Sequence, residues 1–250
     1  MNRASAVVAA VAAIVTAGAV VAASYLSLQA TATVVGAAAV LAAVGWPHLL
    51  GVPARKSQSA AIGLSALLAI VLTATAPGPS FLAWFPAAVA LGVGAVFMIQ
   101  LIRGTGQSFR LESTLGASSG VLVVTMGCGW VAADRLAVNA TDSGVMLVTG
   151  ISIVVAALAC LLPFPDRLAG PVAVVLAALA GPLGALLLTD VPALPAAVVG
   201  VACGVVLAGS RRLLLAREAP LGTLSAMSAG MTPVLATGAL VYLLDKLLLR

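Results

Sequence analysis

The chain has 250 residues, of which 62% are hydrophobic and 8% are charged. Soluble globular domains contain about 25% charged residues, so 12 basic and 7 acidic side chains are too few to cover a water-soluble protein of this length. The composition therefore excludes a soluble protein and predicts a chain whose outer surface is solvated by lipid. The net charge of +5 implies no nucleic-acid partner, because basic loops that face anionic lipid headgroups produce the same balance.

Runs of almost uninterrupted apolar residues predict the transmembrane helices. A helix that rises 1.5 Å per residue needs about 20 apolar residues to cross a hydrocarbon core of about 30 Å. Nine runs have roughly this length, and they cover residues 5–23, 32–51, 59–76, 82–102, 117–133, 144–162, 168–188, 191–208 and 225–244. We therefore predict an all-α, polytopic bundle of about nine spans, with eight to ten allowed, and a single integral membrane domain over residues 1–250.

The first run begins after Asn2 and Arg3 and shares features with a signal peptide. Its apolar stretch is longer than the roughly 7–15 residues of a usual signal-peptide core, although Ala-Ala-Ser at residues 22–24 offers a cleavage site. We expect this first helix to remain uncleaved.

The basic residues predict the orientation, because cytoplasmic loops of membrane proteins carry an excess of Lys and Arg. A cytoplasmic N-terminus places nine of the 12 basic residues inside, namely Arg3, Arg55, Lys56, Arg103, Arg110, Arg167, Arg211, Arg212 and Arg217. Lys246 and Arg250 would then lie outside, which an even number of spans would avoid. The dominance of Arg, Ala, Val and Gly is typical of a GC-rich bacterial genome, so we expect a multi-pass protein of the bacterial inner (cytoplasmic) membrane.

The longest polar connection, residues 103–116, is predicted to face the cytoplasm. It carries the charged residues Arg103, Arg110 and Glu112, together with Phe109, an aromatic residue of the type enriched at interfaces. Two interpretations stay open: a solvated connection, or a surface that binds a membrane-protein partner.

Helix breakers in the seventh and ninth runs indicate where a solute could bind. Gly181, Pro182 and Gly184 lie near the middle of the seventh run, and Thr232 and Pro233 lie in the ninth. Proline removes a backbone donor, and broken helices often line the substrate sites of transporters. These five residues are our candidates for the wall of a substrate cavity, although a simple packing kink would also explain them.

Other patterns point to little chemistry. No Asp, Glu, Lys or Arg lies in the middle of a run, which argues against a proton-coupled carrier. Cys128, Cys160 and Cys203 match no metal-ligand spacing, and the G-x-S-x-G pattern at residues 116–120 opens an apolar helix with no preceding strand. We therefore expect a non-enzyme with no catalytic residues, cofactor or metal site. A parallel internal repeat, with residues 5–102 matching 117–208, is a further hypothesis.

The motifs GWPHLLGVP at residues 45–53, QLIR at 100–103 and GWVAA at 129–133 resemble an uncharacterised family of actinobacterial multi-pass inner-membrane proteins. Members are sometimes labelled permeases, so the resemblance implies a permease-like role and brings no site residues with it. We predict a carrier or channel component for a small or lipidic solute. The alternative is a non-catalytic scaffold or regulator of cell-envelope assembly.

Overall fold

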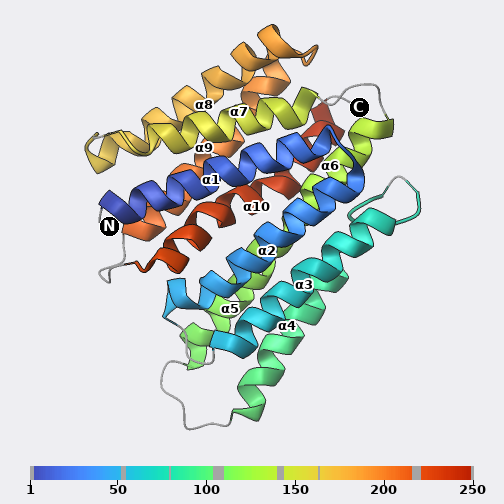
Figure 1. The fold of residues 1–250 in the computed structure, drawn as a ribbon, viewed down its shortest axis with the longest axis vertical. Coiled ribbons are helices and arrows are strands. Elements are labelled where there is room, and N and C mark those ends of the chain that lie inside the picture. Colours follow the sequence, from blue (N-terminus) through green and yellow to red (C-terminus); the bar gives the residue numbers. More distant parts are fainter. Residues whose placement is uncertain are drawn as a thin grey trace.

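The computed structural model describes residues 3–51, 55–78, 80–103, 110–139, 144–162, 164–215 and 221–248. Within these ranges the regular structure consists of ten helices (Figure 1). They are α1 (Arg3–Ser24), α2 (Leu28–Leu50), α3 (Arg55–Thr75), α4 (Phe85–Ile102), α5 (Arg110–Thr125), α6 (Cys128–Asn139), α7 (Gly144–Ala159), α8 (Asp166–Leu188), α9 (Ala193–Leu215) and α10 (Thr223–Leu248).

The predicted fold class is confirmed. Eight helical segments in the described residues are long and apolar enough to cross a membrane, and one of them joins α5 and α6 as Arg110–Ala137. The ninth apolar segment is α7, whose 16 residues rise only about 24 Å. It is therefore shorter than the predicted run at residues 144–162, and too short to span a core of about 30 Å without bilayer thinning.

The fifth predicted run is wrong in its boundaries and continuity. Helix α5 begins at Arg110, so the second half of the predicted connection at residues 103–116 is helical. The span is then interrupted between α5 and α6. The amide of Gly127 donates to the Val124 carbonyl at 3.1 Å, and that of Trp130 to the Gly127 carbonyl at 3.1 Å. These tighter bonds, three residues apart, replace the α-helical pattern for one turn.

The breaks predicted at the prolines are also wrong, because both helices continue through them. Pro171 and Pro182 lie inside α8, and Pro233 lies inside α10. In a bilayer core, unsatisfied backbone groups cost several kcal/mol each, so the chain loses one hydrogen bond at a proline and keeps the helix.

Helix α10 is the centre of the bundle and the most buried spanning helix of the described chain. It packs against α1, α2, α5, α6, α7 and α9. Helices α7, α8 and α9 form one flank, and α3 and α4 form the other (Figure 1). Successive spans are antiparallel, with α5 and α6 together forming one span. The basic residues at the ends of α4 and α9 and the starts of α3, α5 and α8 therefore share one end of the bundle, called here the basic end.

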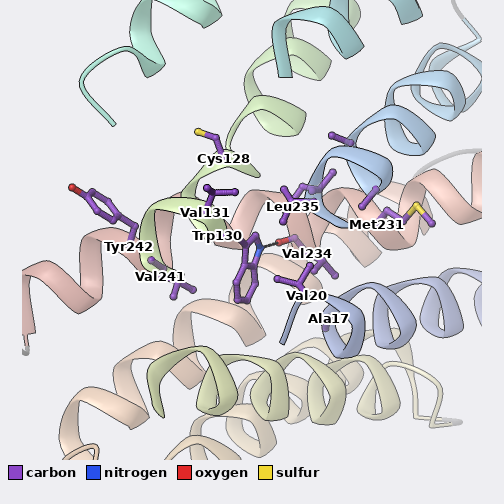
Figure 2. Close-up of a cluster of buried hydrophobic side chains, with 14 of the residues drawn as sticks. Ala17, Val20, Cys128, Trp130, Val131, Met231, Val234, Leu235, Val241 and Tyr242 are labelled. Carbon is purple, nitrogen blue, oxygen red and sulfur yellow. Dashed lines mark hydrogen bonds between the residues drawn. The ribbon is translucent and has the colours of Figure 1, made fainter. Parts of the chain in front are cut away.

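One of the closest contacts in the described bundle joins α6 to α10. Trp130 is fully buried, and its indole Nε1 donates to the Val234 carbonyl at 2.8 Å (Figure 2). A Cβ atom at Gly129 would overlap the α10 backbone at Gly238 and Ala239. Two backbones can approach this closely only where a glycine faces the partner helix. The predicted repeat of residues 5–102 and 117–208 stays a prediction.

Candidate functional site

A groove of about 640 Å³ lies between α9 on one side and α2 and α5 on the other. Helix α10 contacts all three and forms its floor. We call this space the central groove. It is lined by Trp46, Leu49, Leu50, Ser119, Val123, Val205, Val206, Gly209, Ser210, Leu213, Leu214, Ala229, Thr232, Pro233 and Ala236.

The central groove extends from the basic end of the bundle to about the middle of the membrane. Its lining on α2 reaches Leu50, the last residue of that helix, and on α9 it runs from Val205 to Leu214. Nine residues of helix rise about 13.5 Å, close to half of a hydrocarbon core of about 30 Å. The groove is therefore about as deep as one leaflet.

The groove is apolar, and its polar side chains are already engaged. Among the described residues that line it, none is charged. The hydroxyls of Ser119, Ser210 and Thr232 donate to carbonyls of their own helices at 2.8, 2.8 and 2.6 Å. The Trp46 indole Nε1 donates to the Gly116 carbonyl of α5 at 2.8 Å. These bonds leave an apolar surface that suits an apolar ligand.

Of the predicted cavity residues, Thr232 and Pro233 line the central groove. Pro233 has no amide hydrogen, so the Ala229 carbonyl, also in the groove wall, lacks its usual donor one turn later. Thr232 and Pro233 therefore line a groove within a continuous helix, and their role in a substrate cavity stays a prediction.

The other predicted cavity residues lie elsewhere. Gly181, Pro182 and Gly184 belong to α8 and are absent from the groove lining. A Cβ at Gly181 would overlap the Ala196 carbonyl of α9, and one at Gly184 would lie 2.9 Å from Ile151 of α7. These glycines allow α8 to pack closely on its neighbours, so the structure does not bring the two proline segments together.

A smaller cavity of about 60 Å³ adjoins the central groove on the other side of the α9–α10 contact. The two spaces share Ser210, Leu214, Ala229 and Pro233. The small cavity is also lined by Arg211, which brings one positive charge to the basic end of the site.

The predicted partner surface is only partly described. Phe109 lies outside the described residues, Arg103 follows the last residue of α4, and Arg110 and Glu112 lie in the first turn of α5. Glu112 is exposed, whereas Arg103 and Arg110 are half-buried. The surface is therefore formed in part by a packed helix end.

Buried amides anchor that helix end. Gln58 of α3 and Gln100 of α4 both donate from Nε2 to the Ser113 hydroxyl of α5, at 2.8 and 2.7 Å. All three side chains are buried. Such bonds between transmembrane helices contribute about 0.6 kcal/mol on average, so Ser113 joins three helices and fixes where α5 begins.

Two carboxylates that lie directly after predicted runs are buried, which sequence reasoning missed. Asp134 of α6 and Asp245 of α10 are 2% and 5% exposed. Asp134 lies beside the Thr31 hydroxyl of α2, and its Oδ2 accepts no hydrogen bond from the described chain. The only sequence signal was its place directly after the apolar stretch GWVAA at residues 129–133.

The neighbouring Arg135 points in another direction. Its Nη1 donates to the carbonyls of Thr73 and Ala76 at 2.7 and 2.9 Å, and its guanidinium lies 4.2 Å from the centre of the Phe81 ring. Arg135 therefore closes the end of α3 by binding its last carbonyls. Helix α6 does not line the central groove, so these charges lie away from it.

Among the described residues, no group of three His, Cys, Asp or Glu side chains could hold a metal ion. Comparison with protein-family models, curated proteins and solved structures found no match to this chain. The resemblance to an actinobacterial permease-like family therefore stays a prediction, and the case for a function depends on the bundle and its grooves.

Proposed function

We propose that this multi-pass membrane protein is a permease-like carrier that binds a lipidic solute in the central groove and does no covalent chemistry. The observation that supports the proposal is the groove itself: about 640 Å³, apolar, and continuous with the basic end of the bundle. Its volume is in the usual range of small-molecule sites, roughly 300–1,000 Å³.

The chemistry of the groove favours a lipidic solute over a small polar one. A polar solute would need free donors and acceptors, but the hydroxyls of Ser119, Ser210 and Thr232 bond to their own helices. An apolar chain needs none, and contact with Leu and Val side chains is sufficient for it. A polar head could stay at the basic end, where Arg211 lines the adjoining cavity.

Transport would require a second state, because the groove reaches only half-way across the membrane. The other half is closed where Trp130 and Gly129 of α6 pack on α10. The interruption at residues 126–127 separates α6 from α5, whose Val123 lines the groove. In our proposal α6 moves relative to α5 at this point, as discontinuous helices do in carriers.

The groove can be blocked without disturbing the fold. Gly209 lines it, and a Cβ there would meet nothing within 4 Å. Gly209→Phe therefore fills the groove with a ring. The matched control is Gly94→Phe on α4, where a Cβ also meets nothing within 4 Å and which lies outside the groove lining.

The assay is crosslinking of the purified protein with a phospholipid that carries a photoactivatable acyl chain, followed by peptide mapping. We expect labelled peptides from α5, α9 and α10, severalfold less labelling in Gly209→Phe, and unchanged labelling in Gly94→Phe. Movement of a fluorescent lipid across proteoliposome bilayers should fall in the same variant. Equal labelling of both variants would refute the proposal and favour the alternative, a non-catalytic scaffold of cell-envelope assembly.

A further inference from the structure

A second groove, of about 720 Å³, lies between α2 and α3 and is distinct from the central groove. The two grooves share no lining residue. Val40, Val44 and His48 lie one turn apart along α2 and line the second groove, whereas Trp46 and Leu50 of the same helix line the first. The two spaces therefore occupy different faces of α2.

The second groove is apolar over most of its length. Its floor is formed where α2 and α3 come together. A Cβ added to Gly63 of α3 would lie 3.5 Å from the Ala43 Cβ of α2. Its walls carry Val40, Val44 and Leu64, which are exposed on the outside of the bundle. In a bilayer these residues face lipid, so the natural occupant is an acyl chain.

The groove has the length of one leaflet. Its lining on α3 runs from Arg55 to Leu67, and 12 residues of helix rise about 18 Å. Half of a hydrocarbon core is about 15 Å. The groove is thus longer than half of the core, which places the first turn of α3 at the level of the lipid headgroups.

Positive charge is concentrated at that level. Arg55 and Lys56 both line the groove, and both are exposed. His48 lines it from the end of α2, with its Nδ1 donating to the Val44 carbonyl at 3.0 Å. No acidic side chain lines this groove in the described part of the chain. The polar mouth is thus complementary to an anion and the rest of the groove to a hydrocarbon chain.

We propose that the α2–α3 groove binds an anionic phospholipid from the leaflet at the basic end, with its phosphate at Arg55 and Lys56 and one acyl chain between the helices. Arg and Lys are the usual phosphate partners in proteins. Arg55 and Lys56 both lie in the first turn of α3, at the level of the lipid headgroups. This lipid is a bound structural component, and the inference does not depend on the central groove carrying a solute.

The experiment is native mass spectrometry of the full chain in detergent, titrated with phosphatidylglycerol or with phosphatidylcholine of the same acyl chains. The wild-type protein should retain phosphatidylglycerol in preference to phosphatidylcholine. The double substitution Arg55→Gln with Lys56→Gln should weaken phosphatidylglycerol binding about tenfold and abolish the preference. Its control is Arg167→Gln with Arg212→Gln, two exposed residues at the same end that line neither groove. The control removes equal charge and should change binding less than twofold.

A second pair of variants tests the acyl-chain half of the site. Ala60 is exposed and lines the groove, so Ala60→Phe should displace both lipids without disturbing the core. Ala90→Phe, on the exposed face of α4, should displace neither. Size-exclusion elution checks that each variant is folded.

Three results would overturn the inference. An equal loss of phosphatidylglycerol binding in the Arg55/Lys56 variant and in its Arg167/Arg212 control would show that the lipid is attracted to the basic end in general. Full retention of lipid by Ala60→Phe would show that the groove holds no chain. A lipid-free dimer in which Ala60→Phe breaks the association would show that a second copy covers the groove.

Discussion

Replacing Gly129 by Ala should push α6 away from α10 at one of the closest contacts of the described bundle. A Cβ at this position would overlap the backbone of α10, at Gly238 and Ala239. Backbone atoms cannot rotate away as the end of a flexible side chain can, so α6 and α10 must move apart. That movement would also stretch the 2.8 Å bond from the Trp130 indole to the Val234 carbonyl.

The magnitude follows from two opposing effects. Inserting a methyl group into a packed interior costs about 1–3 kcal/mol, because side chains and backbone must shift. Alanine recovers up to about 1 kcal/mol relative to glycine inside a helix. We expect a net loss of about 2 kcal/mol, because backbone must move. A change of 1 kcal/mol shifts the melting temperature of a chain of this size by roughly 2–4 °C, so the expected decrease is about 4–8 °C.

The measurement is the fraction of protein that remains monodisperse on size exclusion after heating in detergent. Gly94→Ala is the control, because a Cβ there meets nothing within 4 Å and the substitution should leave the melting temperature unchanged or slightly raised. Gly238→Ala acts on the same contact, so its combination with Gly129→Ala should cost less than the sum of the two. If Gly129→Ala has the same melting temperature as Gly94→Ala, the close contact of α6 with α10 is refuted.

Three other perturbations have defined outcomes. Trp130→Phe removes the indole donor to α10 and should lower the melting temperature in detergent by a few degrees, since one hydrogen bond contributes about 1 kcal/mol; an unchanged value would mean the bond adds nothing. Asp134→Asn keeps an oxygen for the Thr31 hydroxyl and removes a buried carboxylate with no ion-pair partner in the described chain. Its melting temperature should therefore be no lower than that of wild type, and a clearly lower value would reveal a cation or ion pair at Asp134. In a chain without native cysteines, Thr75→Cys should react with a membrane-impermeant maleimide on intact cells, whereas Lys56→Cys should react only after permeabilisation. The reason is that loops rich in positive charge stay on the cytoplasmic side. The reverse labelling pattern would show the opposite orientation.

Sequence reasoning named two proline segments as candidate cavity walls, and only one of them lines the central groove. Pro233 lies in the wall of the central groove, whereas Pro182 lies in α8 beside Gly181, which packs against α9. The two look alike in sequence, since each follows a glycine-containing apolar stretch. Which of them faces a groove depends on the rotation of its helix and on its neighbours, and neither is a local property.

The same reason explains why Asp134 and the α2–α3 groove were missed. A carboxylate near the end of an apolar run can face headgroups or turn inward, and only packing against α2 turns Asp134 toward Thr31. His48 lies in a predicted run and Arg55 in the connection that follows it, and the contact of α2 with α3 brings them to one groove.

The amino-acid sequence by itself determined the environment, the fold class and the position of almost every span. Those properties depend on the length and polarity of each run, which are additive along the chain and hardly depend on the rest of the protein. Tertiary structure alone decided the helix rotations, the interruption at residues 126–127, the burial of Asp134 and both grooves. In lipid, the apolar surface of a helix is as well solvated outside the bundle as inside it, so hydrophobicity does not choose the face that turns inward; close contacts such as Gly129 on Ala239 do.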